Sequence, residues 1–184
     1  MYDALYNVML GFFPQGSVKL SFVNKGSFGK SQIVYKGSFD DIVEHIGELG
    51  KLYDQTLSVE YKHATIRTKP RFLTNGQVDY EKIGWFIVSK QVIISEKNIT
   101  KYFQNFDFAI ISESQNLSEN FIRKFKNYGL DWSVISSNQN LSEEFIDEMN
   151  KYVDWKNITK YQQKNLSWKF IEKYKHHMDW FIIS

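Results

Sequence analysis

The side chains that most often bind metal ions or carry out catalysis are scarce in this chain. It contains four histidines and no cysteine, so thiolate metal ligands and a cysteine nucleophile are excluded. His176, His177 and Asp179 lie close together in the sequence, but neighbouring helical positions point about 100° apart and no further ligand is nearby. This pattern favours solvated residues near a helix end. The sequence therefore predicts no metal site and no cofactor.

One glycine-rich segment, Gly26-Ser27-Phe28-Gly29-Lys30-Ser31, resembles the end of a phosphate-binding loop, in which backbone amides and a lysine hold phosphate groups. The spacing does not fit, because the first glycine of that motif is missing and a strand rather than a helix is predicted to follow. A flexible hairpin loop is the favoured interpretation. Chemistry through Lys30 and Ser31 stays an alternative, and the sequence as a whole predicts a protein without enzymatic activity.

Basic residues gather toward the C-terminal end, although the whole chain has a formal net charge of only +2. Residues 151–184 contain seven lysines against three acidic residues, a local balance of +4, and Tyr161, Trp168 and Tyr174 are interleaved with them. Phosphate contacts by lysine and base stacking on aromatic rings would suit nucleic acid, whereas the solvated face of a helical repeat explains the same residues without a ligand. The residues of the nucleic-acid alternative are Lys62, Arg67, Lys69, Arg71, Lys160 and Lys164.

A tandem repeat accounts for the spacing of many of these side chains. Aromatic residues at positions 85, 108, 132, 155 and 180 are separated by 23, 24, 23 and 25 residues, and a Leu-Ser or Ile-Ser pair recurs in phase with them. The serines of these pairs are Ser95, Ser118, Ser142 and Ser167. Two independent anchors with one period indicate a repeat architecture with units of about 24 residues.

Each repeat is predicted to form a short helix, a tight turn and a second short helix. The serine is a good N-cap residue, and apolar residues follow it at helical spacing, as Phe145, Ile146 and Met149 do. The aspartate that precedes the aromatic anchor, such as Asp131, is a second N-cap candidate. Because one helix pair cannot bury its own apolar stripe, the copies are expected to stack into an α-solenoid with the recurring aromatic residues in its core.

The N-terminal residues lack the repeat and are predicted to form a different structure. Apolar residues alternate over 18–22, which indicates a strand, and residues 32–36 are expected to pair with it across the glycine loop. Ser38 resembles an N-cap for a helix with Ile42 on its buried face. With a helix before these elements and further strands over 57–68, the order of elements implies a small antiparallel sheet covered by helices.

The predicted fold class is therefore α+β, with a small antiparallel α/β domain over 1–77 followed by a solenoid-like helical repeat domain over 78–184. About 75 residues are marginal for independent folding, so the first domain is expected to dock against the first repeat. Apolar residues make up 42% of the chain and charged residues 24%, which is typical of globular proteins. The longest apolar runs are far below the ~18 residues of a membrane span, so no membrane association is predicted.

Two departures from the repeat predict a binding surface. Trp168 stands where Glu96, Glu119 and Glu143 follow the N-cap serine, an outward position, and exposed aromatic residues are favoured anchors of interfaces. The last copy ends in an apolar run without a polar copy after it, which predicts a surface for a partner or for a second copy of the chain. The predicted partner-binding residues are Trp168, Lys169, Lys173, Phe181 and Ile182.

The pattern Leu-Ser-x-x-Phe-Ile, followed about ten residues later by Asp-Trp-x-x-Ile-Ser, resembles the short tandem repeats of proteins from bacteriophages and giant DNA viruses. It covers residues 79–184 and is most regular over 117–184. The resemblance implies a viral protein that acts by binding in the host cytoplasm, and it brings no catalytic residue with it. We therefore expect a non-enzymatic module that binds and inhibits a host protein, with an anti-CRISPR-like role as one form, and nucleic-acid binding as the alternative.

Overall fold

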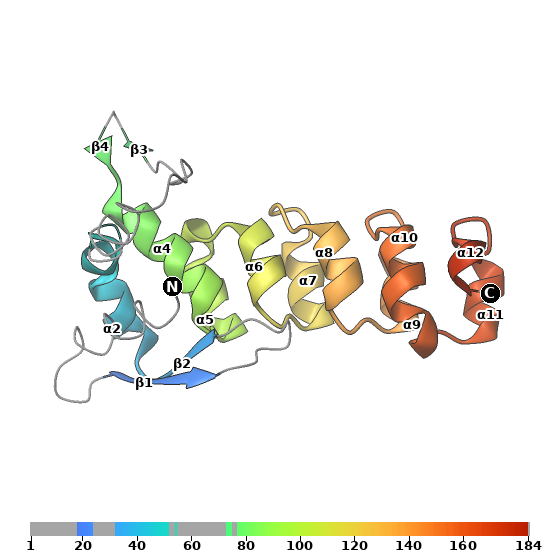
Figure 1. Ribbon diagram of the computed structural model, residues 1–184, viewed down its shortest axis with the longest axis horizontal. Coiled ribbons are helices and arrows are strands. Elements are labelled where there is room, and N and C mark those ends of the chain that lie inside the picture. The colour runs from blue at the N-terminus through green and yellow to red at the C-terminus, as the bar shows by residue number, and fades with distance from the viewer. Residues whose placement is uncertain (1–17, 24–31, 52–53, 55–72, 75–76, 184) are drawn as a thin grey trace, which may run out of the picture. The chain divides into compact units, whose positions relative to one another are not determined.

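Helices dominate the protein, as the repeat predicts. The computed structural model describes residues 18–23, 32–51, 54, 73–74 and 77–183, and most of these lie in helices (Figure 1). The chain divides into two compact units, Met1–Asp107 and Phe108–Ser184. This division falls after the first copy of the repeat, whereas the sequence analysis places the domain boundary at residue 77.

The described strands of the first unit form two antiparallel pairs. The pairs are β1 (Val18–Val23) with β2 (Gln32–Gly37), and β3 (Leu73–Thr74) with β4 (Gln77–Val78). The prediction of β1 and its partner from alternating apolar residues is confirmed, with Leu20 opposite Tyr35. The predicted first helix, the loop at 26–31 and the predicted strands over 57–68 lie outside the described residues.

The first copy of the repeat packs within the first unit, which explains where the units divide. The helices involved are α2 (Phe39–Glu44), α4 (Tyr80–Gln91), α5 (Glu96–Lys101) and the short η3 (Phe103–Asn105). The buried ring of Trp85 on α4 lies 6.5 Å from Phe39, 5.7 Å from Tyr102 and 5.1 Å from Phe106, measured between ring centroids. The Lys101 ammonium and the Tyr102 hydroxyl both donate to the Asp40 carboxylate, each at 2.6 Å. These contacts join α4 and α5 to α2.

Glycines allow α4 to approach the helical residues 46–51 closely. A Cβ atom added to Gly84 would lie 2.0 Å from the carbonyl oxygen of Ile46, and one added to Gly50 would lie 1.9 Å from that of Tyr80. A side chain at either position would therefore collide with backbone, which cannot rotate away as a side chain can. Gly84 precedes the aromatic residue of its copy, as Asp131 does in a later copy, so a glycine stands here at a repeat position that elsewhere holds an aspartate.

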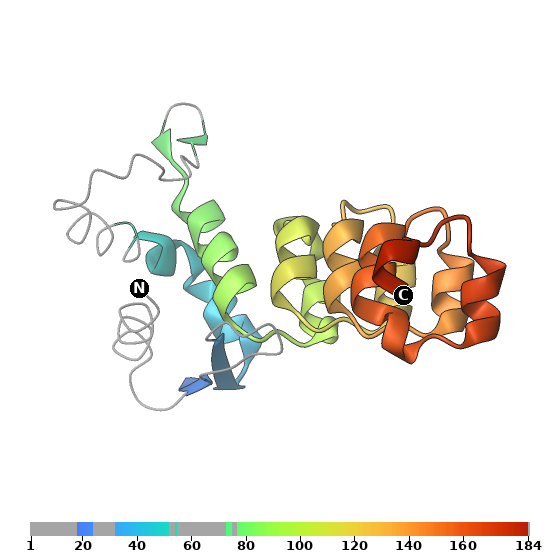
Figure 2. The same cartoon turned by 45° about the vertical axis from the view of Figure 1, so that its right-hand side comes forward.

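The second unit consists of consecutive short helices that follow one another in chain order (Figures 1 and 2). They are α6 (Phe108–Ser114), α7 (Glu119–Phe125), α8 (Trp132–Asn138), α9 (Glu143–Glu148), α10 (Trp155–Asn157), η4 (Ile158–Gln162), η5 (Gln163–Asn165), α11 (Trp168–Lys173) and α12 (Trp180–Ile183). The predicted serine caps are confirmed: the hydroxyl oxygens of Ser118, Ser142 and Ser167 each accept from the backbone N–H three residues on, at 3.2 Å. Asp131 and Asp154 cap α8 and α10.

Two buried glutamines of the second unit, Gln139 and Gln162, connect a helix pair with the one before it. Gln139, with 3% of its surface exposed, accepts from the backbone N–H of Leu117 at 3.0 Å and donates to the carbonyl of Gln115 at 2.9 Å. Gln162 repeats the second contact one copy later, because its amide donates to the carbonyl of Gln139 at 2.6 Å. The side chains therefore satisfy backbone groups of the preceding copy that the short helices leave without a partner.

Hydroxyl groups make a second connection between copies. The Ser136 hydroxyl donates to the Trp132 carbonyl of its own helix at 2.6 Å and accepts from the backbone N–H of Asp154, the cap of the next copy, at 2.9 Å. Ser112 and Thr159 accept from the backbone N–H groups of Asp131 and Asp179 in the same way. The last residue of the Asp-Trp-x-x-Ile-Ser pattern is thus a hydrogen-bonding link between successive helix pairs.

Replacing Gly84 with alanine should destabilise the first unit, because the new methyl group would force α4 away from the backbone at Ile46. We expect a loss of about 2 kcal/mol or more in the free energy of unfolding, measured by urea denaturation of the full chain. Gly47→Ala is the matched control, since its Cβ would lie 3.4 Å from the nearest atom, Cγ of Glu81. It should leave stability unchanged or raise it by up to about 1 kcal/mol through helix propensity. Equal effects of the two variants would contradict the close crossing.

Replacing Gln139 with alanine should destabilise the second unit, because it leaves the buried backbone N–H of Leu117 without its acceptor. We expect a loss of about 2–3 kcal/mol in the free energy of unfolding, followed by circular dichroism during urea denaturation. The neighbouring Asn140 is exposed, so Asn140→Ala should change stability by less than about 0.5 kcal/mol. A Gln139→Ala variant as stable as Asn140→Ala would show that the contacts between copies do not depend on this side chain.

Candidate interaction surface

The last helix pair, α11 and α12, carries the two most exposed aromatic side chains of the described residues, Phe181 and Trp168, together with the exposed Trp180. Trp168 is 64% exposed, Trp180 is 43% exposed and Phe181 is 97% exposed. The rings of Trp168 and Trp180 meet edge to face, with 6.4 Å between their centroids. The prediction that Trp168 is exposed is therefore confirmed. We refer to Trp168, Trp180 and Phe181 as the aromatic surface.

Local structure holds Trp168 in this outward position. Ser167 caps α11, and the start of the helix then places Phe170 and Ile171 in the core while Trp168 faces away from it. The carboxylate of Glu143 on α9 accepts from both the backbone N–H and the hydroxyl of Ser167. Trp168 is therefore attached to a helix start that the preceding copy fixes.

The expectation that every recurring aromatic residue lies in the core is wrong for the later copies. Trp85 and Phe108 are buried, whereas Trp132 and Trp155 are half-buried and Trp180 is exposed. The difference follows from what covers each ring. Trp155 packs against Tyr174 and His177, with ring centroids at 4.5 Å and 5.1 Å, whereas Trp180 has the exposed Trp168 as its ring contact.

Lys173 is exposed but joined to the preceding copy. Its ammonium and the Tyr174 hydroxyl both donate to the Asp147 carboxylate on α9. The hydrogen bonds from Lys173 and then from Tyr174 hold the pKa of Asp147 below its ordinary value. The same contact with Asp147 raises the pKa of Lys173. The lowered pKa of Asp147 and the raised pKa of Lys173 both favour the charged forms of the pair. The contact is therefore a charge-assisted link between α9 and α11 rather than a catalytic acid.

The remaining residues proposed from the sequence fall into separate places. Lys160, Lys164 and Lys169 are exposed on or beside the last helices, and Ile182 is half-buried on α12. Lys62, Arg67, Lys69 and Arg71 of the nucleic-acid alternative, and Lys30 and Ser31 of the enzymatic alternative, lie outside the described residues. Within the ranges that the structure does describe, no group of three or more metal-ligating side chains comes together. Among the residues that the structure describes, those of the predicted site on α11 and α12 lie on one helix pair.

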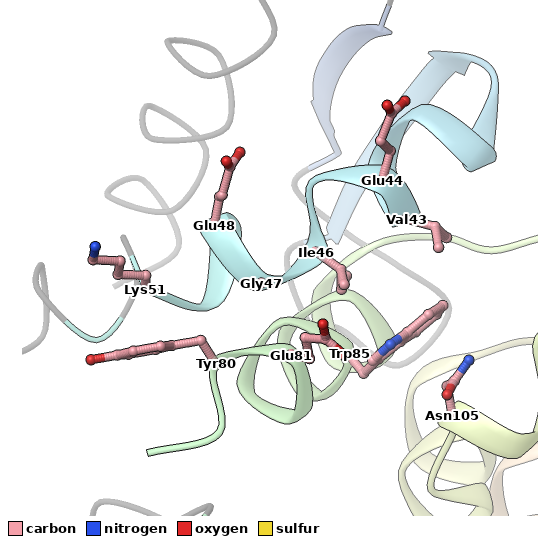
Figure 3. A pocket seen from close by; sticks show the side chains of 10 residues that line it. All are labelled: Val43, Glu44, Ile46, Gly47, Glu48, Lys51, Tyr80, Glu81, Trp85 and Asn105. Atoms are coloured by element: carbon pink, nitrogen blue, oxygen red, sulfur yellow. The ribbon is translucent and has the colours of Figure 1, made fainter. Parts of the chain in front are cut away.

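A pocket of about 600 Å³ opens in the first unit between α2, the helical residues 46–51 and α4 (Figure 3). Its walls include the Trp85 ring and three carboxylates, those of Glu44, Glu48 and Glu81. Figure 3 shows the carboxylates of Glu44 and Glu48 turned away from Trp85 rather than toward a common point. Polar groups that do not converge supply no defined ligand geometry, so we assign no ligand to this pocket.

Sequence reasoning missed the polar residues that orient the surface. Glu143 has the same place in its copy as Glu119, whose carboxylate accepts from the N–H of Ser142 at 2.7 Å. Gln91, Gln115, Gln139 and Gln162 recur at intervals of 24, 24 and 23 residues, which is the period of the repeat. That recurrence is the signal that could have identified them as structural residues.

Comparison with protein-family models, with curated proteins and with solved structures found no match for this chain. In the part of the chain that the structure describes, no helix has the length and apolar character needed to cross a bilayer.

The Asp147 link should make stability depend on pH. Because folding lowers the pKa of Asp147, its contribution is present above the ordinary aspartate pKa and is lost as the pH falls through the lowered value. Wild type should therefore lose more thermal stability than Asp147→Asn on going from about pH 6 to about pH 2. The neighbouring exposed Glu144 provides the control, since Glu144→Gln should follow the wild-type curve. Parallel curves for wild type and Asp147→Asn would contradict a folded-state role of this carboxylate.

Proposed function

We propose that this chain is a non-enzymatic protein–protein interaction module without a cofactor. Its architecture in this proposal is an α+β N-terminal part followed by a solenoid-like array of copies of about 24 residues. The hydrogen bonds of Gln139, Gln162 and Ser136 support this array, because they recur between successive helix pairs. Stacked repeats present continuous surfaces, and proteins of this kind commonly act by binding.

The observation that carries the proposal is the exposure of Trp168, Trp180 and Phe181 on one helix pair. Large aromatic side chains in water cost free energy that burial in an interface recovers, and tryptophan is among the residues that contribute most to binding. The contact between the Trp168 and Trp180 rings makes them one patch rather than two scattered residues. Contiguous exposed apolar patches of this kind mark interaction sites.

We also propose a viral role, in which the module binds and inhibits a host protein in the host cytoplasm. The basis is the resemblance of the Leu-Ser-x-x-Phe-Ile and Asp-Trp-x-x-Ile-Ser pattern to repeats of bacteriophage and giant-virus proteins. An inhibitor of a host defence factor, similar in role to anti-CRISPR proteins, is one form of this proposal. Binding alone would be sufficient for such a role, since it requires only that the module cover a functional surface of its target.

Nucleic-acid binding is the second candidate, and one observation favours it. Lys160 and Lys164 are exposed, and the Lys160 ammonium lies 4.9 Å from the ring centroid of Tyr161, which is itself 52% exposed. Lysine contacts to phosphate together with an aromatic ring for base stacking are the two components of single-strand recognition. This candidate requires binding that weakens steeply as the salt concentration rises.

Affinity purification of the tagged full chain from bacterial lysate, with and without nuclease, distinguishes the two candidates. We expect a stoichiometric protein partner that survives nuclease treatment and is lost with Trp168→Ala. Tyr161→Ala should retain it, because Tyr161 is an exposed aromatic residue outside the aromatic surface. Recovery of nucleic acid in place of protein, with salt-sensitive binding that Tyr161→Ala weakens, would select the second candidate. A protein partner retained equally by Trp168→Ala would contradict the proposed surface.

A further inference from the structure

Trp168 replaces a glutamate that, in the two preceding copies, forms a hydrogen bond to the next helix pair. In α7 and α9 the residue directly after the cap is a glutamate, and its carboxylate accepts from the N–H of the following cap serine. The pairs concerned are Glu119 with Ser142 and Glu143 with Ser167. In α11 the corresponding residue is Trp168, which offers an indole and no acceptor. The forward side of α11 is therefore not built to receive another copy of the repeat.

The segment that carries the aromatic surface is basic. Residues 164–181 contain four lysines against Glu172 and Asp179, a balance of +2 with the histidines neutral. Lys173 and Lys175 are engaged with Asp147 and Glu172, and the exposed Lys164 and Lys169 form no ion pair with any other residue whose position is described. Lys164 and Lys169 lie on either side of Trp168 in the chain. Both lysines are therefore available to a ligand that carries negative charge.

We propose that the aromatic surface binds an acidic segment of a partner protein that carries a large apolar anchor residue. The anchor packs against the edge-to-face pair of Trp168 and Trp180, and acidic side chains on either side of it meet Lys164 and Lys169. This inference rests on the proposed function and specifies the chemistry of the partner. Apolar burial supplies the affinity, and the flanking charges select acidic partners and reject basic ones.

The charge of the surface favours an acidic partner over a second copy of the chain. A symmetric pairing of two aromatic surfaces would bring two sets of the same lysines together, and like charges across an interface oppose association. An acidic segment instead neutralises Lys164 and Lys169 when it binds. Self-association is therefore an outcome that would count against the inference.

The probe is a phage-displayed library of random dodecapeptides selected on the immobilised full chain. We expect enrichment of peptides with several acidic residues around a tryptophan, phenylalanine or leucine. A synthetic peptide of the selected sequence should bind Trp168→Ser at least about tenfold more weakly than wild type. The double variant Lys164→Glu/Lys169→Glu should lose a similar factor. The matched control is Lys151→Glu/Lys156→Glu, which changes the net charge equally at two exposed lysines outside the surface and should change affinity by less than about threefold.

Several results would overturn the inference. They are the absence of any enriched peptide, enrichment of neutral or basic peptides, equal weakening by both double variants, and self-association of the chain that Trp168→Ser abolishes. If affinity purification still recovers a protein partner through Trp168, the proposed function stands and only the acidic character of the partner is refuted. If neither experiment finds a ligand that depends on Trp168, both proposals fail.

Discussion

The need to satisfy buried backbone groups at the ends of very short helices governs the second unit. Helices of six or seven residues leave most of their terminal N–H and carbonyl groups without partners inside the helix. Gln139 and Gln162 supply those partners from the next copy, in sites where water has little access. Because an unsatisfied buried polar group is costly, each helix pair has one favourable placement against the pair before it. At α11 and α12 other side chains make the connection, because Glu143 accepts from Ser167 and Thr159 accepts from the backbone N–H of Asp179.

The features predicted correctly from the sequence are those that depend on near neighbours in the chain. An N-cap needs only a serine or aspartate and the N–H two or three residues later, so Ser142 and Asp154 could be identified directly. The contacts of Gln139 and Glu143 join residues more than 20 positions apart. Composition alone did not identify Gln139, because burial of a glutamine depends on a partner that one copy of the repeat does not contain.

The same limit explains the differences among the aromatic residues. Trp155 and Trp180 have the same residue type and the same place in the repeat, yet the first is covered by Tyr174 and the second is exposed. The position in the repeat predicts the direction of a side chain, whereas the residues of the next copy decide whether that side chain is buried. Gly84 shows this for the backbone, because its small size matters only through the distant carbonyl of Ile46. That contact assigns the first copy to the first unit, which the repeat pattern alone could not reveal.

The same contacts between copies prepare the aromatic surface for binding. A helix of six residues such as α11 is unstable by itself in water, so its order comes from the neighbouring copy. Glu143 fixes the start of α11, and Asp147 fixes its end through Lys173 and Tyr174. Trp168 lies between these two attachments and is exposed without being on a loose segment. Because its helix is already ordered, a partner that buries the ring loses less conformational entropy on binding than one that must first order a flexible loop.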